Sequence, residues 1–142
     1  MDDKLRSLLE ALASHEWEGF ERLLDAEPRL VDARDDEGLT PLHRAAQMGG
    51  SRIGSLIARG ADVDARDLAG RTPLYMLILH SHSLSCLFRL IEGGADVNAV
   101  DDEGVSVLRL AVSQRTGLWP TILLRHGARM APIPGDDSPY DR

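Results

Sequence analysis

The chain has 142 residues, an apolar fraction of 43%, an aromatic fraction of 4% and a formal net charge of −7 at neutral pH. This length suits one compact domain whose core is built mainly from small aliphatic side chains. The negative charge argues against nucleic acids and anionic membranes as ligands, because phosphate groups are bound by clustered Lys and Arg. If charge selects a partner, that partner should carry a basic surface.

The single cysteine and the hydropathy of the sequence narrow the class of protein further. Cys86 is the only cysteine, which excludes an intrachain disulfide and a thiolate metal cluster. The sequence opens MDDK rather than with a basic segment before an apolar stretch, and its longest apolar run, residues 74–79, is too short to span a bilayer. We therefore expect a cytoplasmic protein without membrane contact, and a mature exported form is the alternative.

The first 35 residues are expected to form two helices, at about 4–13 and about 17–26, followed by a connection that contains Pro28. The second of these helices has apolar residues at helical spacing, namely Trp17, Phe20, Leu23 and Leu24. This segment is interpreted as an N-terminal capping unit.

The rest of the chain repeats itself. DDEGLTPLHRAAQMG begins at Asp35, DLAGRTPLYMLILHS at Asp67 and DDEGVSVLRLAVSQR at Asp101, and their shared glycines are 32 and 34 residues apart. A second series, IARGADVDARD, IEGGADVNAVD and LRHGARM, interleaves with the first. Two interleaved series with one period indicate stacked structural repeats.

Each copy has a local physical interpretation. The Asp-x-x-Gly start predicts a turn, because Asp bonds its own backbone and Gly tolerates positive φ. Thr followed by Pro predicts a helix N-cap and the first helical residue, and Leu42, Leu74 and Leu108 then take the first inward position. Two short helices should follow, with the Gly of each GAD ending the second helix and an extended finger after it.

This pattern resembles the ankyrin repeat. The family motif Gly-x-Thr-Pro-Leu-His-x-Ala-Ala is matched throughout by residues 38–46. The next copy has Tyr75 in place of His, and the last has Ser106, Val107 and Arg109 in place of Thr, Pro and His. The resemblance implies an all-α solenoid of stacked helix-turn-helix units with finger-like β-turn loops, and a role in binding other macromolecules.

Residues 1–130 are accordingly expected to form a single ankyrin-like domain. Its repeats should span about 4–35, 36–67, 68–101 and 102–130. The tail, residues 131–142, is rich in Pro, Asp and Gly and is expected to be disordered.

The C-terminal repeat has no further repeat to cover it. Its last helix, at about 118–126, carries four apolar residues, Trp119, Ile122, Leu123 and Leu124. Either Met130 and Ile133 fold over this face, or another chain does. We therefore expect a weak homodimer or a partner contact at this end.

Three places in the sequence suggest chemistry, and each has a structural interpretation. His80 and His82 could belong to a metal-dependent enzyme, but residues two apart on a helix do not face each other and no third ligand is near. His43 could act as a general base, but in the family this His ties neighbouring repeats together. Cys86 falls on an apolar helical stripe and is expected to be a buried, inert thiol. We predict no catalytic residue, no metal, no cofactor and no enzymatic activity.

Acidic residues gather in the predicted fingers and should line up when the repeats stack. They either steer a basic partner or solubilise an edge, and some make turns. The three clusters are Asp32, Asp35, Asp36 and Glu37; Asp62, Asp64 and Asp67; and Asp96, Asp101, Asp102 and Glu103.

The resemblance also implies where a partner would bind, because the family's concave face is built from finger tips and first helices. The corresponding variable positions include apolar residues bordered by acids, as protein interfaces do. They are Asp36, Glu37, Leu39, Gln47, Met48, Leu68, Ala69, Arg71, Leu79, His80, Asp102, Glu103, Val105, Ser113 and Gln114. The predicted function is a protein-binding adaptor, inhibitor or sequestering factor. The alternative is an immunity or inhibitor protein that covers the active site of a basic enzyme or toxin.

Overall fold

The computed structural model describes residues 2–49, 52–80 and 83–130. Within these ranges the chain forms eight α-helices, one short 3₁₀ helix and a single isolated β-bridge between Val100 and Ser106, so the predicted all-α class is confirmed. No helix in this described part is long and apolar enough to cross a membrane. The elements are α1 (Asp3–Ala13), α2 (Trp17–Ala26), η1 (Pro28–Asp32), α3 (Pro41–Gln47), α4 (Ile53–Ala58), α5 (Pro73–His80), α6 (Leu84–Glu92), α7 (Val107–Ser113) and α8 (Trp119–Arg125).

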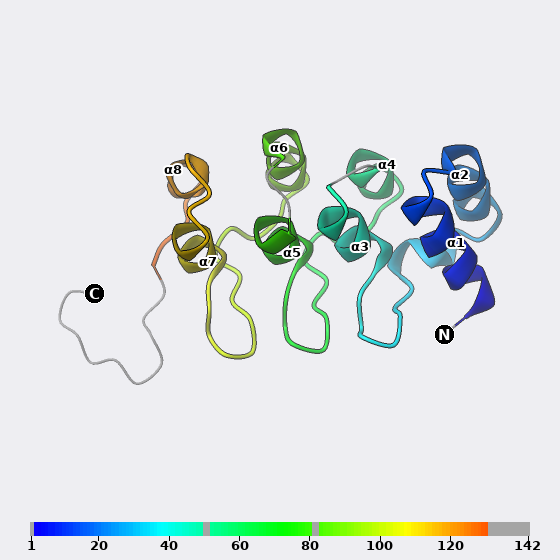
Figure 1. The fold of residues 1–142 in the computed structure, drawn as a ribbon, viewed down its shortest axis with the longest axis horizontal. Helices are drawn as coiled ribbons and strands as arrows, with labels where there is room; N and C mark the ends of the chain where they lie inside the picture. Colours follow the sequence, from blue (N-terminus) through cyan, green and yellow to red (C-terminus); the bar gives the residue numbers. More distant parts are fainter. Residues whose placement is uncertain (1, 50–51, 81–82, 131–142) are drawn as a thin grey trace.

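The helices stack side by side in two rows (Figure 1). The inner row is α1, α3, α5 and α7, and the outer row is α2, α4, α6 and α8. In the inner row α3 packs on α5 and α5 on α7, while in the outer row α4 packs on α6. Three loops extend from the inner row, away from the outer row: the first finger (31–40), the second finger (61–72) and the third finger (95–106). The surface formed by these fingers and the inner helices is called the finger face.

The inner helices begin where the repeated motif predicts. The Thr40 hydroxyl accepts the His43 N–H at 3.4 Å, and the Ser106 hydroxyl accepts the Arg109 N–H at 3.1 Å. Pro41 occupies the first turn of α3, where its missing N–H is not needed. These caps satisfy donors that a helix leaves unpaired at its start, and so fix the register of each inner helix.

Repeated leucines build the core. Leu42, Leu74 and Leu108 are 0%, 0% and 2% exposed, as expected for the first inward position of each inner helix. Every residue from Pro73 to Ile78 of α5 is buried, because this helix lies between α3 and α7. Cys86 is also buried, which confirms the interpretation of its thiol as part of an apolar stripe.

Leu39 belongs to this core, so its predicted contact with a partner is wrong. Its side chain is only 1% exposed, and its N–H donates to Asp35 Oδ1 at 3.0 Å. The residue lies at the base of the first finger, where the chain turns back toward α3, and its apolar side chain points inward. Val105, the equivalent residue of the third finger, is half-buried against the same core.

The C-terminal repeat is better covered than predicted. Trp119 and Leu123 are 3% and 0% exposed, because α8 turns both side chains toward the core beside α7. Leu118 and Leu124 remain 69% and 54% exposed. Ile133 and the rest of the tail lie outside the described residues, and the homodimer at this end stays a prediction.

Gly70 allows neighbouring fingers to touch. Its φ is +78°, and a Cβ at this position would lie 2.8 Å from the Asp102 backbone nitrogen and 2.3 Å from its Oδ1. The Asp102 N–H donates to the Ala69 carbonyl at 2.9 Å, so this close approach is part of the stack. Glycine is therefore needed both for its backbone conformation and for its lack of a side chain.

We expect Gly70→Ala to lower the free energy of unfolding by about 2–3 kcal/mol, because the steric contact adds to the cost of a positive φ. Gly127→Ala is the matched control: its φ is +95° and no atom lies within 4 Å of the added Cβ, so only the backbone cost applies. Urea unfolding followed by circular dichroism measures both. Equal losses would show that the contact with Asp102 contributes nothing.

Candidate functional site

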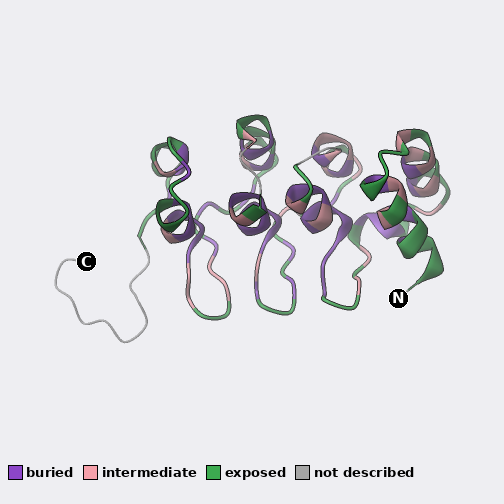
Figure 2. Cartoon of the chain, viewed as in Figure 1, coloured by how far each residue is buried: buried purple, intermediate pink, exposed green. Residues whose placement is uncertain are grey.

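The predicted partner contacts other than Leu39 lie on the fingers or toward the ends of the inner helices, and most are accessible (Figure 2). The exposed ones are Asp36, Glu37, Met48, Leu68, Ala69, His80, Asp102, Glu103, Ser113 and Gln114. The half-buried ones are Gln47, Arg71, Leu79 and Val105. Most of the predicted positions are therefore accessible, and the polar contacts decide which of their groups are available to a ligand.

One aspartate closes each finger. Oδ1 of Asp35, Asp67 and Asp101 accepts two backbone N–H groups of its own finger at 2.8–3.0 Å. This is the Asp-x-x-Gly turn that the sequence predicted, and it shapes all three fingers alike. These carboxylates therefore support the finger face, and they are not free charges on it.

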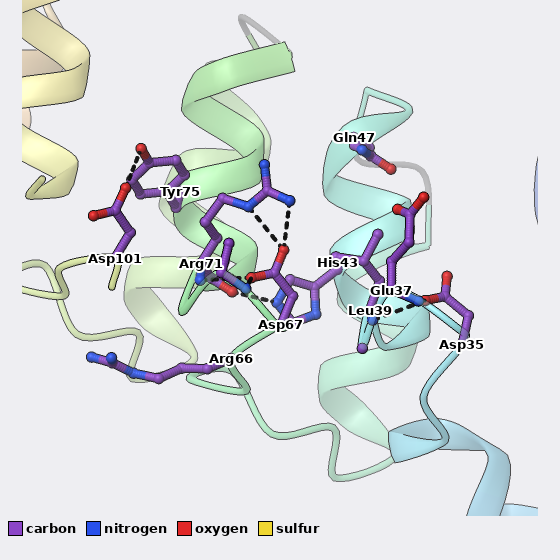
Figure 3. A network of polar contacts seen from close by, with 12 residues as sticks. Asp35, Glu37, Leu39, His43, Gln47, Arg66, Asp67, Arg71, Tyr75 and Asp101 are labelled. Carbon is purple, nitrogen blue, oxygen red and sulfur yellow. Dashed lines mark hydrogen bonds and ion pairs between the residues drawn. The ribbon is translucent and has the colours of Figure 1, made fainter. Parts of the chain in front are cut away.

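The second oxygen of two of these aspartates holds an arginine in a bidentate pair. Figure 3 shows the pair of Asp67 with Arg71. Asp35 Oδ2 accepts Arg44 Nε at 2.9 Å and Nη2 at 2.6 Å, and Asp67 Oδ2 accepts Arg71 Nε at 2.9 Å and Nη2 at 2.8 Å. The two carboxylates are only 5% and 0% exposed. Burial alone would raise the pKa of each, but the arginine and the backbone N–H donors outweigh burial, so both pKa values are lowered.

His43 and Tyr75 tie successive repeats together. His43 Nε2 donates to the Arg71 carbonyl at 2.8 Å, while its Nδ1 accepts the Thr40 N–H at 3.1 Å, which confirms the structural role expected for this His. At the equivalent position of the next repeat, the Tyr75 hydroxyl donates to Asp101 Oδ2 at 2.9 Å. Burial and this bond raise the pKa of Tyr75 to about 12. Tyr replaces His here without loss of the link to the next finger.

A second row of side chains links the loops that follow the outer helices. In each case a side-chain oxygen of one repeat accepts a backbone N–H of the next repeat, at 2.8–2.9 Å. The acceptor and donor pairs are Asp32 with Asp62, Asp64 with Asp96, and Asn98 with Arg129. Much of the predicted acidic strip is thus structural, although Asp32, Asp62, Asp64 and Asp96 are themselves exposed. Its exposed residues at the finger tips are Asp36, Glu37, Asp102 and Glu103.

A hollow of about 330 Å³ lies between the second and third fingers. Among the described residues, the Asp102 and Glu103 side chains form no hydrogen bond or ion pair, whereas the Arg71 guanidinium at the rim is already paired with Asp67. Leu68, at the tip of the second finger, is 76% exposed, and its side chain lies next to Gly38 of the first finger. The lining residues are Ala69, Arg71, Tyr75, Leu79, Asp101, Asp102 and Glu103.

The first finger forms a similar hollow of about 310 Å³ with Leu9 of α1. Here Arg44 lies within 3.5 Å of Glu37 Oε2 in addition to its pair with Asp35. The positive charge of Arg44 offsets the acids at this position. The hollow between the second and third fingers is therefore the more strongly acidic of the two.

Two lining residues, Tyr75 and Asp101, were not among the predicted contacts. In the sequence, Tyr75 stands at the His position of the motif, and Asp101 belongs to the third acidic cluster, at the start of a turn. The available signal was the replacement of His by Tyr, which places an aromatic ring and a hydroxyl on the helix that faces the third finger.

The residues of the metal-dependent alternative do not form a described site. His80 is exposed at the end of α5, and His82 lies outside the described residues. Within the described ranges, no group of three His, Cys, Asp or Glu side chains is placed to hold a metal ion.

Comparisons with known proteins agree with this architecture. The ankyrin-repeat family profile matches residues 37–68 and 69–102. The chain is similar to the human neurogenic locus notch homolog protein 1 (37% identity over 112 residues, 73% of this chain and 4% of that protein). It is also similar to the mouse B-cell lymphoma 3 protein homolog (39% over 102 residues, 69% and 22%) and to the Arabidopsis thaliana E3 ubiquitin-protein ligase KEG (34% over 109 residues, 75% and 7%).

The repeated motif, the paired helices and these matches together identify the chain as an ankyrin-repeat protein. It spans less than a quarter of the length of each of these three relatives, so the likeness concerns only a part of each.

Proposed function

We propose that this protein binds a basic segment of another protein through its finger face, and that it acts as an adaptor, inhibitor or sequestering factor with no catalytic step of its own. Ankyrin repeats are protein–protein interaction modules. The observation that carries the proposal is the hollow between the second and third fingers, with the unpaired carboxylates of Asp102 and Glu103 at its edge.

The lining of this hollow suits a Lys or Arg side chain. Leu79 and the Tyr75 ring supply an apolar wall for the aliphatic part of such a side chain, and the two carboxylates lie where its charged head would emerge. Exposed Leu68 adds an apolar contact outside the hollow. A basic segment with an apolar neighbour therefore fits better than an acidic or wholly apolar one.

Hydrogen bonds between neighbouring fingers also order the finger face before a partner binds. The Leu68 N–H donates to the Glu37 carbonyl at 3.3 Å and the Asp102 N–H to the Ala69 carbonyl at 2.9 Å, so the three fingers are joined tip to tip. A surface that is already ordered loses little conformational entropy when a partner binds. This supports a preformed site.

Reversing the two charges tests the proposal. We expect Asp102→Lys/Glu103→Lys to weaken binding of a captured partner by about 100-fold or more at low salt, because close charge pairs contribute strongly to association. The matched control is Glu18→Lys/Glu92→Lys, which makes the same charge change on exposed positions of α2 and α6. Partners are captured from the native source on wild-type protein, and each affinity is then measured by surface plasmon resonance.

Circular dichroism and the urea midpoint should be unchanged in both double variants, since none of these side chains supports the core. Equal weakening in the two variants would mean that only net charge matters, and no weakening in either would place the interface elsewhere. If the captured partner's basic segment borders its active site, the protein is an inhibitor of that enzyme.

A further inference from the structure

A third hollow, of about 410 Å³, lies among the outer helices α2, α4 and α6. None of its lining residues belongs to the finger face. They are Trp17, Arg52, Gly54, Ser55, Ser85, Cys86 and Arg89. The chain has a net charge of −7, yet two arginines line this hollow. It therefore differs from the acidic hollows of the finger face both in charge and in position.

The charge of Arg52 is only partly neutralised. Its guanidinium lies 4.6 Å from the centre of the Trp17 ring, and its nearest carboxylate oxygen belongs to Glu21, at 3.6 Å. That carboxylate is already engaged, because it accepts Arg59 Nη2 at 2.7 Å and the Ser55 hydroxyl at 2.7 Å. Arg52 is thus held in place by an aromatic face, with donors left for a further acceptor.

Arg89 has no acidic partner in the described part of the chain. Its guanidinium reaches from α6 across Gly54 of α4, where a Cβ would lie only 2.4 Å from Nη1. Gly54 therefore leaves the space that this guanidinium occupies. Ser85 precedes Arg89 by one turn on the same face of α6, and its hydroxyl likewise forms no hydrogen bond with the described residues.

We propose that this hollow binds a phosphorylated side chain of a partner protein. A phosphate monoester carries close to two negative charges and three acceptor oxygens, which matches two guanidinium groups and a hydroxyl better than a carboxylate does. A volume of about 410 Å³ exceeds what a phosphate ion needs and leaves room for the side chain that carries it. The site is independent of the finger face, so the protein could hold two partner segments at once.

The two tryptophans provide the assay. Trp17 lines the hollow under Arg52, whereas Trp119 is 3% exposed in the C-terminal repeat and serves as an internal reference. ¹H–¹⁵N spectra of the whole protein are recorded during titration with a degenerate peptide library that has one fixed central phosphoserine. The same library with serine or glutamate at that position, and inorganic phosphate alone, are the parallel titrations. We expect the Trp17 indole signal to move with the phosphopeptides and the Trp119 signal to stay.

Variants then assign the effect to the hollow. Arg89→Gln should weaken binding by about tenfold or more, as expected for loss of a charge-assisted hydrogen bond. Gly54→Ala should also weaken it, because the added methyl group displaces the guanidinium while alanine favours the helix. Arg125→Gln on α8 removes the same charge elsewhere in the outer row and should have no effect.

Three results would overturn the proposal. The first is a Trp17 signal that does not move at millimolar phosphopeptide. The second is an equal response to the glutamate library or to inorganic phosphate, and the third is equal weakening by Arg89→Gln and Arg125→Gln.

Discussion

Replacing Asp67 by alanine is expected to lower the free energy of unfolding by about 3–5 kcal/mol, because it leaves a half-buried arginine and two backbone donors without their buried acceptor. The Asp67 carboxylate is 0% exposed and takes the Ala69 and Arg71 N–H groups on Oδ1 and the Arg71 guanidinium on Oδ2. The second finger should lose its shape as well as its stability. Urea unfolding followed by circular dichroism gives the change.

Asp102→Ala is the matched control for this prediction. Asp102 is an exposed aspartate of the third finger whose carboxylate forms no hydrogen bond with described residues, so its loss should change stability by about 0.5 kcal/mol or less. If both variants unfold at the same urea concentration, the buried Asp67 and its pair with Arg71 do not stabilise the stack.

Replacing His43 by alanine should lower the free energy of unfolding by about 3–4 kcal/mol, because a fully buried ring and the bonds that it makes to two repeats are lost together. The ring is 0% exposed and links the Thr40 N–H to the Arg71 carbonyl. His126→Ala removes an exposed His of α8's C-terminal end and should leave stability nearly unchanged. A similar loss in both variants would contradict the bridging role of His43.

The buried His43 also predicts that the stability of the fold depends on pH. Burial is the largest cause that lowers the pKa of His43, and it outweighs the bond to the Arg71 carbonyl, which raises it. Between the lowered folded value and the unfolded value of 6.5, the unfolded chain binds more protons than the native one, so stability falls as the pH falls through this window. Above pH 6.5 this contribution is fully present. The unfolding midpoint of wild type should therefore decline on acidification from neutral pH, whereas His43→Ala should show a flatter profile.

The fold could be predicted because its signals are local. Turn, cap and first inward leucine stand within eight residues of one another in each copy, and each follows from the chemistry of its own residues. The replacements at Tyr75 and Ser106 kept the same roles, since a hydroxyl can cap a helix or bridge to the next finger as Thr and His do.

The site was predicted less completely, because it depends on which side chains meet across repeats. Sequence spacing placed Asp102 and Glu103 at a finger tip. It could not show that Asp67 forms an ion pair with Arg71, whereas the carboxylates of Asp102 and Glu103 remain unpaired among the described residues. It also assigned Leu39 to the surface, since a family's variable positions carry no information on burial in this chain. The place of the Arg89 guanidinium in the hollow that Arg52 also lines depends on Gly54 of α4, which no local pattern in α6 reveals.

Hydrogen exchange of the protein in complex with its captured partner tests the central claim most directly. If the finger face binds the partner, backbone amides of the second and third fingers, with those at the start of α5, should exchange more slowly in the complex than in the free protein. Slower exchange confined to the outer helices α2, α4, α6 and α8, with the fingers unchanged, would contradict it.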